Sequence, residues 1–303
     1  MTAPARGRGY RDMALAGVLW GTIGPAAALV DEHTSLDPLQ TSFWRLLVAV
    51  VPLTLLALVA SRGVERPARK WLLLGLAVGA VTGMSQLSYF AAVASAGIAV
   101  PTLIATGLAP VLTALGQTVL FGDRPDARTL LAVAGAIAGL ALLVADAPGH
   151  VTAGGVLLAV VSAMTFATYS LGAGPVSRRL DVRVVNAAAI AGGALAMLPF
   201  VLLTGGPGLA DSAVGWLALL HLGLIVSGLA YALYFSAART LPSTHLTILS
   251  LLEPFVAALI AAAAFGESLT LGVVVGGALL LTAVAALRPR PDAPPPEPTP
   301  VPA

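Results

Sequence analysis

The chain has 303 residues, of which 58% are hydrophobic and only 10% are charged, and its mean hydropathy is +0.93. Soluble domains carry about 25% charged residues, so this inventory excludes a protein whose whole surface faces water. The absence of cysteine excludes disulfides, thiolate metal sites and a cysteine nucleophile. The net charge of +2 comes from basic residues that stand in short clusters between apolar runs. That pattern is typical of membrane topology, so we expect no nucleic-acid partner.

The apolar residues form ten runs, and roughly 20 such residues as a helix suffice to cross a bilayer. They predict transmembrane helices over residues 13–30, 38–60, 71–94, 98–121, 129–145, 151–172, 184–204, 212–238, 243–265 and 269–287. The first run resembles a signal peptide in outline, but the nine further runs favour the first helix of a multi-pass protein. Residues 1–12 are predicted to be a cytoplasmic N-terminal tail. The proline-rich residues 288–303 are predicted to be a disordered cytoplasmic tail.

The basic residues predict how these helices are oriented. Every Lys and Arg except Arg45 falls in the N-terminal segment, in the C-terminal segment or in alternate connections between the predicted helices. The remaining connections contain acidic residues, such as Asp31, Asp146 and Asp211, but no basic ones. Because Lys and Arg are enriched on the cytoplasmic side of membranes, we expect both termini in the cytoplasm.

A repeated pattern relates the two halves of the chain. Pro110 and Pro254 each lie eleven residues before a Phe-Gly pair, and the two prolines are 144 residues apart. We predict a first five-helix repeat over residues 13–146 and a second over residues 151–287. Since five is an odd number, the second repeat is predicted to lie upside down relative to the first. Inverted repeats are typical of alternating-access transporters.

Several motifs carry a family resemblance. They are Leu19-Trp20-Gly21-Thr22, Phe43-Trp44-Arg45, Leu252-Glu253-Pro254 and Phe265-Gly266-Glu267-Ser268-Leu269. In this order and spacing they resemble the EamA-type members of the drug/metabolite transporter superfamily, over about residues 13–287. The first repeat departs from the second, with Ala109-Pro110 where the second has Glu253-Pro254.

The resemblance implies a carrier of ten helices in two repeats, located in a bacterial inner membrane, and not an enzyme. Such carriers are often exporters of amino acids or related metabolites. The resemblance also implies a central cavity lined by the first, third, fourth, sixth, eighth and ninth helices. The fifth and tenth helices would pack together at one end. Two glycine pairs, Gly135/Gly139 and Gly276/Gly277, fit such close packing of the fifth and tenth helices.

Two charges, Arg45 and Glu253, lie inside the predicted helices. A charge in the bilayer costs at least about 2.5–3.5 kcal/mol on insertion scales and normally faces the bundle interior. At about 1.5 Å per residue, Arg45 lies roughly 10 Å and Glu253 roughly 18 Å from the outer face. An arginine side chain can cover much of that difference, so we interpret both as substrate-binding groups. The alternatives are a structural ion pair, or an Arg45 that extends to the outer interface.

Aromatic and amide side chains of the cavity helices complete the predicted substrate-binding site. Its residues are Trp20, Arg45, Gln86, Tyr89, Tyr169, Tyr231, Tyr234 and Glu253. For the aromatic members the alternative is an interfacial belt. Pro110 and Pro254, at equivalent positions of the repeats, are predicted as gating kinks, with simple packing as the alternative. No catalytic residue, metal site or cofactor is predicted.

These features predict a secondary transporter, an exporter of small polar metabolites such as amino acids. One positive and one negative group suit a zwitterion. An exporter of lipophilic drugs or cations from the same superfamily is the alternative. Expected partners are a small-molecule substrate and the lipid bilayer, with proton coupling left open, and the chain is expected to be a monomer or weak dimer.

Two remote alternatives are a channel and an intramembrane serine protease. A channel requires a pore lined by rings of charges or carbonyl groups, which a single Arg and a single Glu do not supply. A protease would use Ser85 in its Gly-x-Ser-x motif, with His221 or His245 as the base, but it gives no reason for inverted repeats. The two histidines could instead relay protons, although a local hydrogen bond to the backbone is the favoured interpretation.

Overall fold

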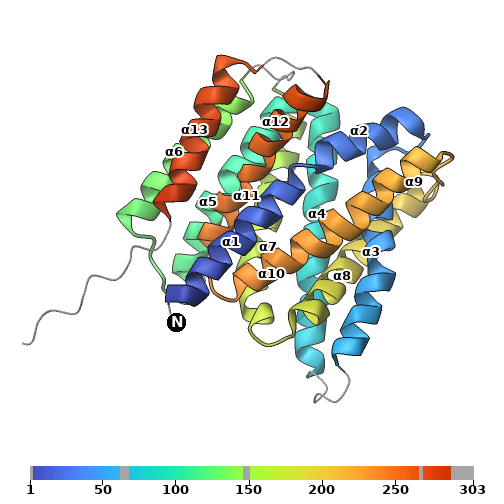
Figure 1. The fold of residues 1–303 in the computed structure, drawn as a ribbon, viewed down its shortest axis with the longest axis horizontal. Helices are drawn as coiled ribbons and strands as arrows, with labels where there is room; N and C mark the ends of the chain where they lie inside the picture. The colour runs from blue at the N-terminus through green and yellow to red at the C-terminus, as the bar shows by residue number, and fades with distance from the viewer. Residues whose placement is uncertain (1–2, 62–67, 146–150, 266–268, 288–303) are drawn as a thin grey trace, which may run out of the picture.

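Helices account for almost all of the residues that the computed structural model describes, which are 3–61, 68–145, 151–265 and 269–287 (Figure 1). Within these ranges there is no extended strand, so the prediction of an all-α protein is confirmed. In chain order the elements are α1 (Ala3–Trp20), α2 (Ile23–His33), α3 (Pro38–Ala60), α4 (Arg69–Ala96), α5 (Ala99–Phe121), α6 (Ala127–Leu143), α7 (Ala153–Ser177), α8 (Val182–Leu203), α9 (Ala213–Leu220), the π-helical η1 (His221–Ala230), α10 (Tyr231–Ala238), α11 (Ser243–Ser250), α12 (Leu252–Phe265) and α13 (Leu271–Ala286).

Within the described residues, eight helical spans are long and apolar enough to cross a bilayer, and two shorter apolar helices, α6 with 17 residues and α13 with 16, accompany them. The bounds of α3 agree with the prediction, and Asp37 and Gln40 fix its start by forming a capping box. The first helix begins at Ala3 rather than at Met13. The segment predicted as an N-terminal tail is therefore largely helical.

The predicted helix 13–30 is interrupted between α1 and α2, at Gly21 and Thr22. Proline lacks a backbone N–H, and its ring clashes with the carbonyl four residues earlier. Pro25 stands four residues after Gly21. The Thr22 hydroxyl donates a hydrogen bond of 2.7 Å to the Leu19 carbonyl, which satisfies one of the backbone groups at the interruption.

The predicted helix 243–265 is interrupted in the same way between α11 and α12. Pro254 stands four residues after Ser250, the last residue of α11, so the clash again falls at the end of the helix. The interruption places Glu253 in the first turn of α12. Pro110, at the equivalent position of the first repeat, lies inside the continuous α5. Of the two prolines predicted as kinks, Pro254 therefore accompanies an interruption of its helix, and Pro110 does not.

The predicted helix 212–238 is divided into α9, η1 and α10. No proline lies in η1, whose wider turn displaces backbone hydrogen bonds. The carbonyl of Gly228 in η1 accepts a 2.8 Å hydrogen bond from the side-chain amide of Asn186 on α8. A neighbouring helix thus satisfies a backbone group of the π-helical segment, as the apolar surroundings require.

Close glycine contacts join the two halves of the bundle. α4 packs against both α7 and α8. A Cβ atom at Gly79 of α4 would collide with the Ala189 carbonyl of α8, and a Cβ at Gly192 of α8 would collide with the backbone of Leu76. Larger residues at either glycine would force these helices apart. The contact brings the cavity-lining faces of α4 and α8 together.

α6 and α13 pack against one another (Figure 1), as the glycine pairs predict. A Cβ at Gly139 would stand 2.6 Å from the Gly276 carbonyl oxygen, and Gly135 faces Ala283, whereas Gly277 faces α12 instead. Residue numbers therefore rise along α6 as they fall along α13, so the two helices are antiparallel. Because they begin 144 residues apart, equivalent elements of the two repeats run in opposite directions.

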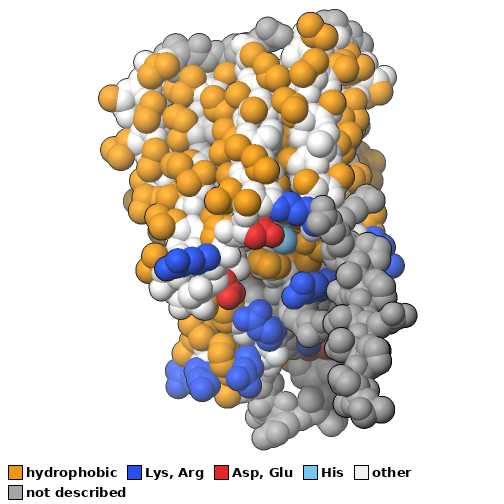
Figure 2. Space-filling view, turned by 90° about the vertical axis from the view of Figure 1, so that its left-hand side faces the viewer, with side chains coloured by type: hydrophobic (Ala, Val, Ile, Leu, Met, Phe, Trp, Pro, Cys, Tyr) orange, Lys and Arg blue, Asp and Glu red, His pale blue; other side chains and the backbone are white. Residues whose placement is uncertain are grey.

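The surface is divided between apolar and basic regions. Hydrophobic side chains cover the upper part of the view in Figure 2, and Lys and Arg side chains gather in its lower part. Large side chains are more than two-thirds exposed on several helices, among them Val119, Leu131, Leu203 and Leu271. Apolar surface on this scale is expected where helices contact lipid. The fold is that of a multi-pass membrane protein.

Candidate substrate site

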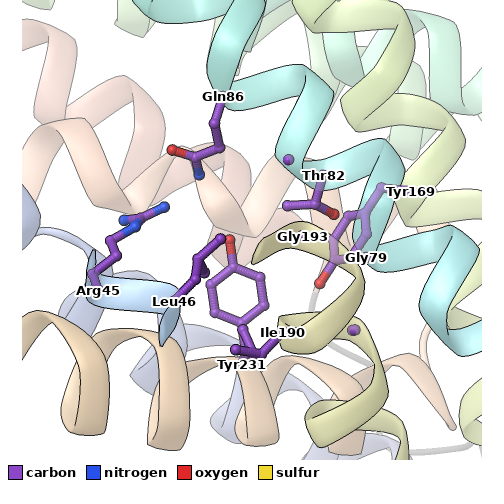
Figure 3. Close-up of a pocket in the computed structure, with 11 residues that line it drawn as sticks. Arg45, Leu46, Gly79, Thr82, Gln86, Tyr169, Ile190, Gly193 and Tyr231 are labelled. Atoms are coloured by element: carbon purple, nitrogen blue, oxygen red, sulfur yellow. The ribbon is translucent and has the colours of Figure 1, made fainter. Parts of the chain in front are cut away.

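A small cavity lies between α3, α4, α7, α8 and α10 (Figure 3). The guanidinium of Arg45, the amide of Gln86 and the hydroxyl of Tyr231 point toward one another across it, and Tyr169 lines the same space. The cavity volume, taken for the centre of a water-sized sphere, is about 10 Å³. That is room for about one water molecule. The centre of the bundle is therefore closed in this structure.

An aromatic cluster extends from the cavity wall. Tyr169 and Tyr234 stack with ring centroids 5.1 Å apart, and Trp20 packs edge-on against Tyr231 at 5.2 Å. Such pairs contribute roughly 0.5–1.5 kcal/mol beyond the area they bury. Two phenylalanines that the sequence analysis did not single out belong to the same group. The aromatic cluster consists of Trp20, Phe166, Tyr169, Tyr231, Tyr234 and Phe235.

Hydrogen-bonding groups in this region lack partners. Trp20 Nε1, Arg45 Nε and the hydroxyls of Tyr169 and Tyr234 are buried and form no hydrogen bond with the described residues. A buried polar group left unpaired costs about 1–3 kcal/mol, and most such groups in proteins are paired. Arg45 and Tyr169 line the central cavity, while Trp20 and Tyr234 belong to the adjoining aromatic cluster. Unpaired groups in the wall of a cavity are expected where a polar molecule completes the site.

Arg45 is only 4% exposed, so it does not extend to the surface of the bundle, and that alternative is wrong for this structure. Among the described residues no carboxylate lies within 4 Å of its guanidinium. The alternative of a direct ion pair with Glu253 is therefore also wrong. Glu253 is half-buried in the first turn of α12, where the helix dipole favours a carboxylate.

Tyr89 and Glu253 do not line the closed cavity, although both belong to the predicted site. The Tyr89 hydroxyl forms a 2.7 Å hydrogen bond with Thr102 and so joins α4 to α5. The other predicted residues line the cavity or belong to the aromatic cluster.

Helix interruptions position several of the predicted residues. Trp20 is the last residue of α1, Tyr231 is the first residue of α10, and Glu253 is the second residue of α12. A helix end orients its side chains independently of the preceding segment. Discontinuous helices of this kind frequently form the binding sites of transporters. Of these three residues, Tyr231 lines the central cavity and Trp20 packs against it, whereas Glu253 lies outside the cavity lining.

The structure reveals a further buried charge, Asp12, which lies in α1 and is 5% exposed. Its carboxylate accepts a 2.8 Å hydrogen bond from Ser236 of α10 and pairs with the exposed Arg11 at 3.2 Å. The burial of Asp12 was not predicted, because the apolar run begins one residue later. The basic residues near Asp12 led to the prediction that this segment is a cytoplasmic tail.

The two histidines contact side chains of other helices, so the expectation of local backbone hydrogen bonds is wrong. His221 Nε2 lies 2.8 Å from the Thr22 hydroxyl, which joins η1 to the interruption before α2. His245 Nδ1 lies 2.6 Å from the Tyr10 hydroxyl, and its Nε2 lies 3.4 Å from the Thr129 hydroxyl. Each histidine therefore links separate elements of the bundle.

The alternative of a serine protease finds no geometric support. Ser85 donates a 3.0 Å hydrogen bond to the Ser162 carbonyl at the contact of α4 with α7, and the histidines contact other groups. Across the described ranges, no three His, Cys, Asp or Glu side chains gather in a way that could hold a metal ion.

The fold and the long apolar helices are those of a multi-pass membrane protein of the helical-bundle class, with a small closed cavity at its centre. A family model described as the EamA-like transporter family matches the chain twice, over residues 9–145 and 153–288. The chain belongs to this family, within the drug/metabolite transporter superfamily. The two matches begin 144 residues apart, so the two-repeat architecture is confirmed with the spacing that the prolines indicated.

Curated relatives agree with this assignment. The chain is 30% identical over 285 residues to "Uncharacterized transporter YwfM" of Bacillus subtilis (strain 168), which covers 91% of this chain and 92% of the relative. An "Uncharacterized transporter" of Archaeoglobus fulgidus is 29% identical over 279 residues, covering 91% and 94% respectively. One crystal structure matches with a TM-score of 0.76 at 22% identity, covering 94% of this chain and 96% of that one, which supports the fold alone.

Proposed function

We propose that the protein is a secondary transporter that exports small zwitterionic metabolites, with amino acids as the leading class, across the bacterial inner membrane by alternating access. The observation that carries the proposal is the group of buried, unpaired hydrogen-bonding atoms around a closed cavity that also contains the unpaired Arg45. In this proposal ten helices span the membrane in two inverted repeats, and both termini lie in the cytoplasm.

The charges of the site favour a zwitterion. Arg45 would bind a carboxylate, since the planar guanidinium matches carboxylate geometry, and Glu253 would face the ammonium group. Among the described residues, the two side chains form no ion pair with each other. A substrate with one charge of each sign would neutralise both, and buried charges are tolerated only when each has a partner. Trp20 and Tyr169 would then supply hydrogen-bond donors and apolar faces.

The closed centre supports a carrier rather than a channel. A channel conducts through a continuous pore lined by selective groups, whereas the central cavity has room for about one water molecule. A carrier must close around its substrate and open to one side at a time. The antiparallel contact of α6 and α13 supports the inverted repeats that such a mechanism uses, and the clustered Lys and Arg residues support cytoplasmic termini.

Counterflow in liposomes tests the substrate class. The purified protein would be reconstituted with each of the twenty protein amino acids inside and the same labelled amino acid outside. We expect exchange of at least one amino acid. Its amide and its methyl ester, which lack the carboxylate charge, should compete at least about tenfold more weakly, because a buried charge would be left unpaired. Equal competition by these analogues refutes the zwitterion proposal, and exchange of lipophilic cations alone would indicate a drug exporter.

Two variants test the roles of the charges. Arg45→Ala and Glu253→Gln should lose most of the exchange while keeping normal yield and thermal stability. The matched controls are Arg179→Ala and Glu32→Gln, which remove exposed charges elsewhere and should exchange at the normal rate. Normal exchange by Glu253→Gln would remove Glu253 from the binding site. Loss of folding in both site variants, with rescue by the charge-swapped double variant, would show a structural pair instead.

A further inference from the structure

A larger cavity opens at the end of the bundle where α5 and α7 end and α11 begins. Its volume, on the same measure as the central cavity, is about 190 Å³. The polar part of its wall comes from Gln117 of α5, Asp123 just after α5, Arg178 at the end of α7 and Ser243 of α11. The basic connections at this end are those that predict the cytoplasmic side. We refer to this cavity as the vestibule.

The side chain of Arg178 lies along the vestibule wall. Its guanidinium lies against Gly174, where a Cβ atom would stand 3.1 Å from Nη1 and 3.2 Å from the Ala238 carbonyl oxygen. The missing side chain of Gly174 therefore makes the space that the guanidinium occupies. Among the described residues no carboxylate lies within 4 Å of Arg178. Its charge is free to bind an anionic group in the vestibule.

Gln117 has a fixed orientation that leaves its amide donors available. Its Oε1 accepts hydrogen bonds from the Thr244 backbone N–H at 3.2 Å and from the Thr244 hydroxyl at 3.0 Å. Only the oxygen of the amide can accept from a backbone N–H, so the assignment of its two ends is secure. The NH₂ group thus remains for a ligand, and the carboxylate of Asp123 supplies an acceptor in the same wall.

We propose that the vestibule is a loading subsite, in which the transported zwitterion binds between Arg178 and Asp123, with the Gln117 amide as a further donor, before it reaches the central cavity. This inference rests on the proposed function, because it takes the solute to be a zwitterion that leaves the cytoplasm. The volume of the vestibule is below the roughly 300–1,000 Å³ of pockets for drug-sized ligands, so it suits a smaller solute.

Leu171 of α7 forms part of the apolar wall of the vestibule. Tyr169, two residues earlier on the same helix, lines the central cavity, so α7 contributes to both cavities from different faces. The Leu171 side chain packs on the bare backbone of Gly116, where a Cβ would stand 2.5 Å from Leu171 Cδ1.

A single cysteine tests occupancy without a transport assay. The chain has no native cysteine, so Ser243→Cys places one thiol in the vestibule wall. The protein in detergent would be treated with the anionic reagent sulfonatoethyl methanethiosulfonate and, separately, with its cationic trimethylammonium counterpart. The ratio of the anionic to the cationic reaction rate should be higher at Ser243→Cys than at Ser61→Cys, the control outside the vestibule. Adding Arg178→Ala should remove this preference. Each of the twenty amino acids would then be tested for slowing the reaction at Ser243→Cys.

We expect the amino acids that exchange in counterflow to protect the thiol, and their amides to protect it less. Arg178→Ala and Asp123→Asn should raise the KM for exchange by about two- to fivefold, the range expected of one exposed charge contact, with little change in the maximal rate. The control Arg179→Ala should change neither quantity.

Counterflow without protection, or Arg178→Ala indistinguishable from Arg179→Ala in both assays, overturns the loading subsite and leaves the proposed function standing. Failure of every amino acid in both assays overturns the proposed function together with this inference.

Discussion

Replacing Gly139 by alanine should force α6 away from α13. The added Cβ would stand 2.6 Å from the Gly276 carbonyl oxygen and 3.0 Å from the backbone nitrogen of Leu280. Close carbon–oxygen contacts in proteins are about 3.3 Å or longer, so the helices would have to separate by about 0.7 Å. The atoms in the way belong to the backbone of α13, and no rotation of a side chain can relieve the contact.

The size of the effect follows from opposing contributions. Overpacking of a well-packed contact costs about 1–3 kcal/mol, while alanine recovers at most about 1 kcal/mol of helix propensity relative to glycine. We therefore expect a net loss of about 1–2 kcal/mol in the free energy of unfolding. At roughly 2–4 °C per kcal/mol for a chain somewhat smaller than this one, the unfolding temperature should fall by about 2–8 °C.

Thermal unfolding of the purified protein in detergent measures this shift, and Gly135→Ala is the matched control. Gly135 lies one turn earlier on α6, and the nearest atom to its added Cβ would be Ala283 Cβ at 3.8 Å, an ordinary contact. The control should be neutral or stabilised by up to about 1 kcal/mol. A Gly139→Ala protein that unfolds at or above the temperature of Gly135→Ala would refute the described packing of α6 on α13.

Other predictions concern topology, the helix interruptions and the contact of His221. A cysteine introduced at Ser35 should react with an impermeant thiol reagent from outside intact cells and one at Asp126 should not; the reverse result would contradict cytoplasmic termini. Pro25→Ala and Pro254→Ala restore the missing N–H groups, so each should keep or raise thermal stability while slowing exchange, and unchanged exchange would show that the interruptions have no role in transport. Thr22→Val removes the hydrogen bond with the imidazole and should lower the unfolding temperature by about 2–6 °C, from roughly 1–1.5 kcal/mol; no shift would show that this contact contributes nothing.

Most of the fold could be predicted because membrane helices need long apolar runs, and such runs can be recognised in the sequence without knowledge of the tertiary structure. α3 follows its run because a capping box fixes its start. The interruptions were missed, although two of them carry a local signal: Pro25 stands five residues after the end of α1, and Pro254 stands four residues after the end of α11. Pro110 shows why the signal is insufficient, since α5 continues past it. The π-helical η1 contains no proline and depends on its contact with Asn186.

The candidate site was less predictable, because periodicity does not determine how each helix is rotated about its axis. Tyr169 and Tyr89 have the same residue type and both lie inside long helices, but only Tyr169 lines the central cavity, while Tyr89 binds Thr102. Charges were easier to place, since burial of Arg45 follows from its cost in lipid. The vestibule was missed entirely, because Arg178 and Asp123 fall outside the apolar runs and look like ordinary connection residues.

The shortness of α6 and α13 has a consequence for the surrounding lipid. At about 1.5 Å per residue, their 17 and 16 residues reach only about 24–26 Å, against a hydrocarbon core of about 30 Å. Neither helix can lengthen at its start, because Asp126 and Thr270, which are 144 residues apart, cap both N-termini. The bilayer must therefore thin beside this antiparallel pair, while the longer helices across the bundle meet lipid of ordinary thickness. The length of the lipid acyl chains should then affect the flank of the carrier that contains α6 and α13 more than the opposite flank. We expect faster exchange in shorter-chain lipids, and we expect the protein to accumulate where the membrane is thin.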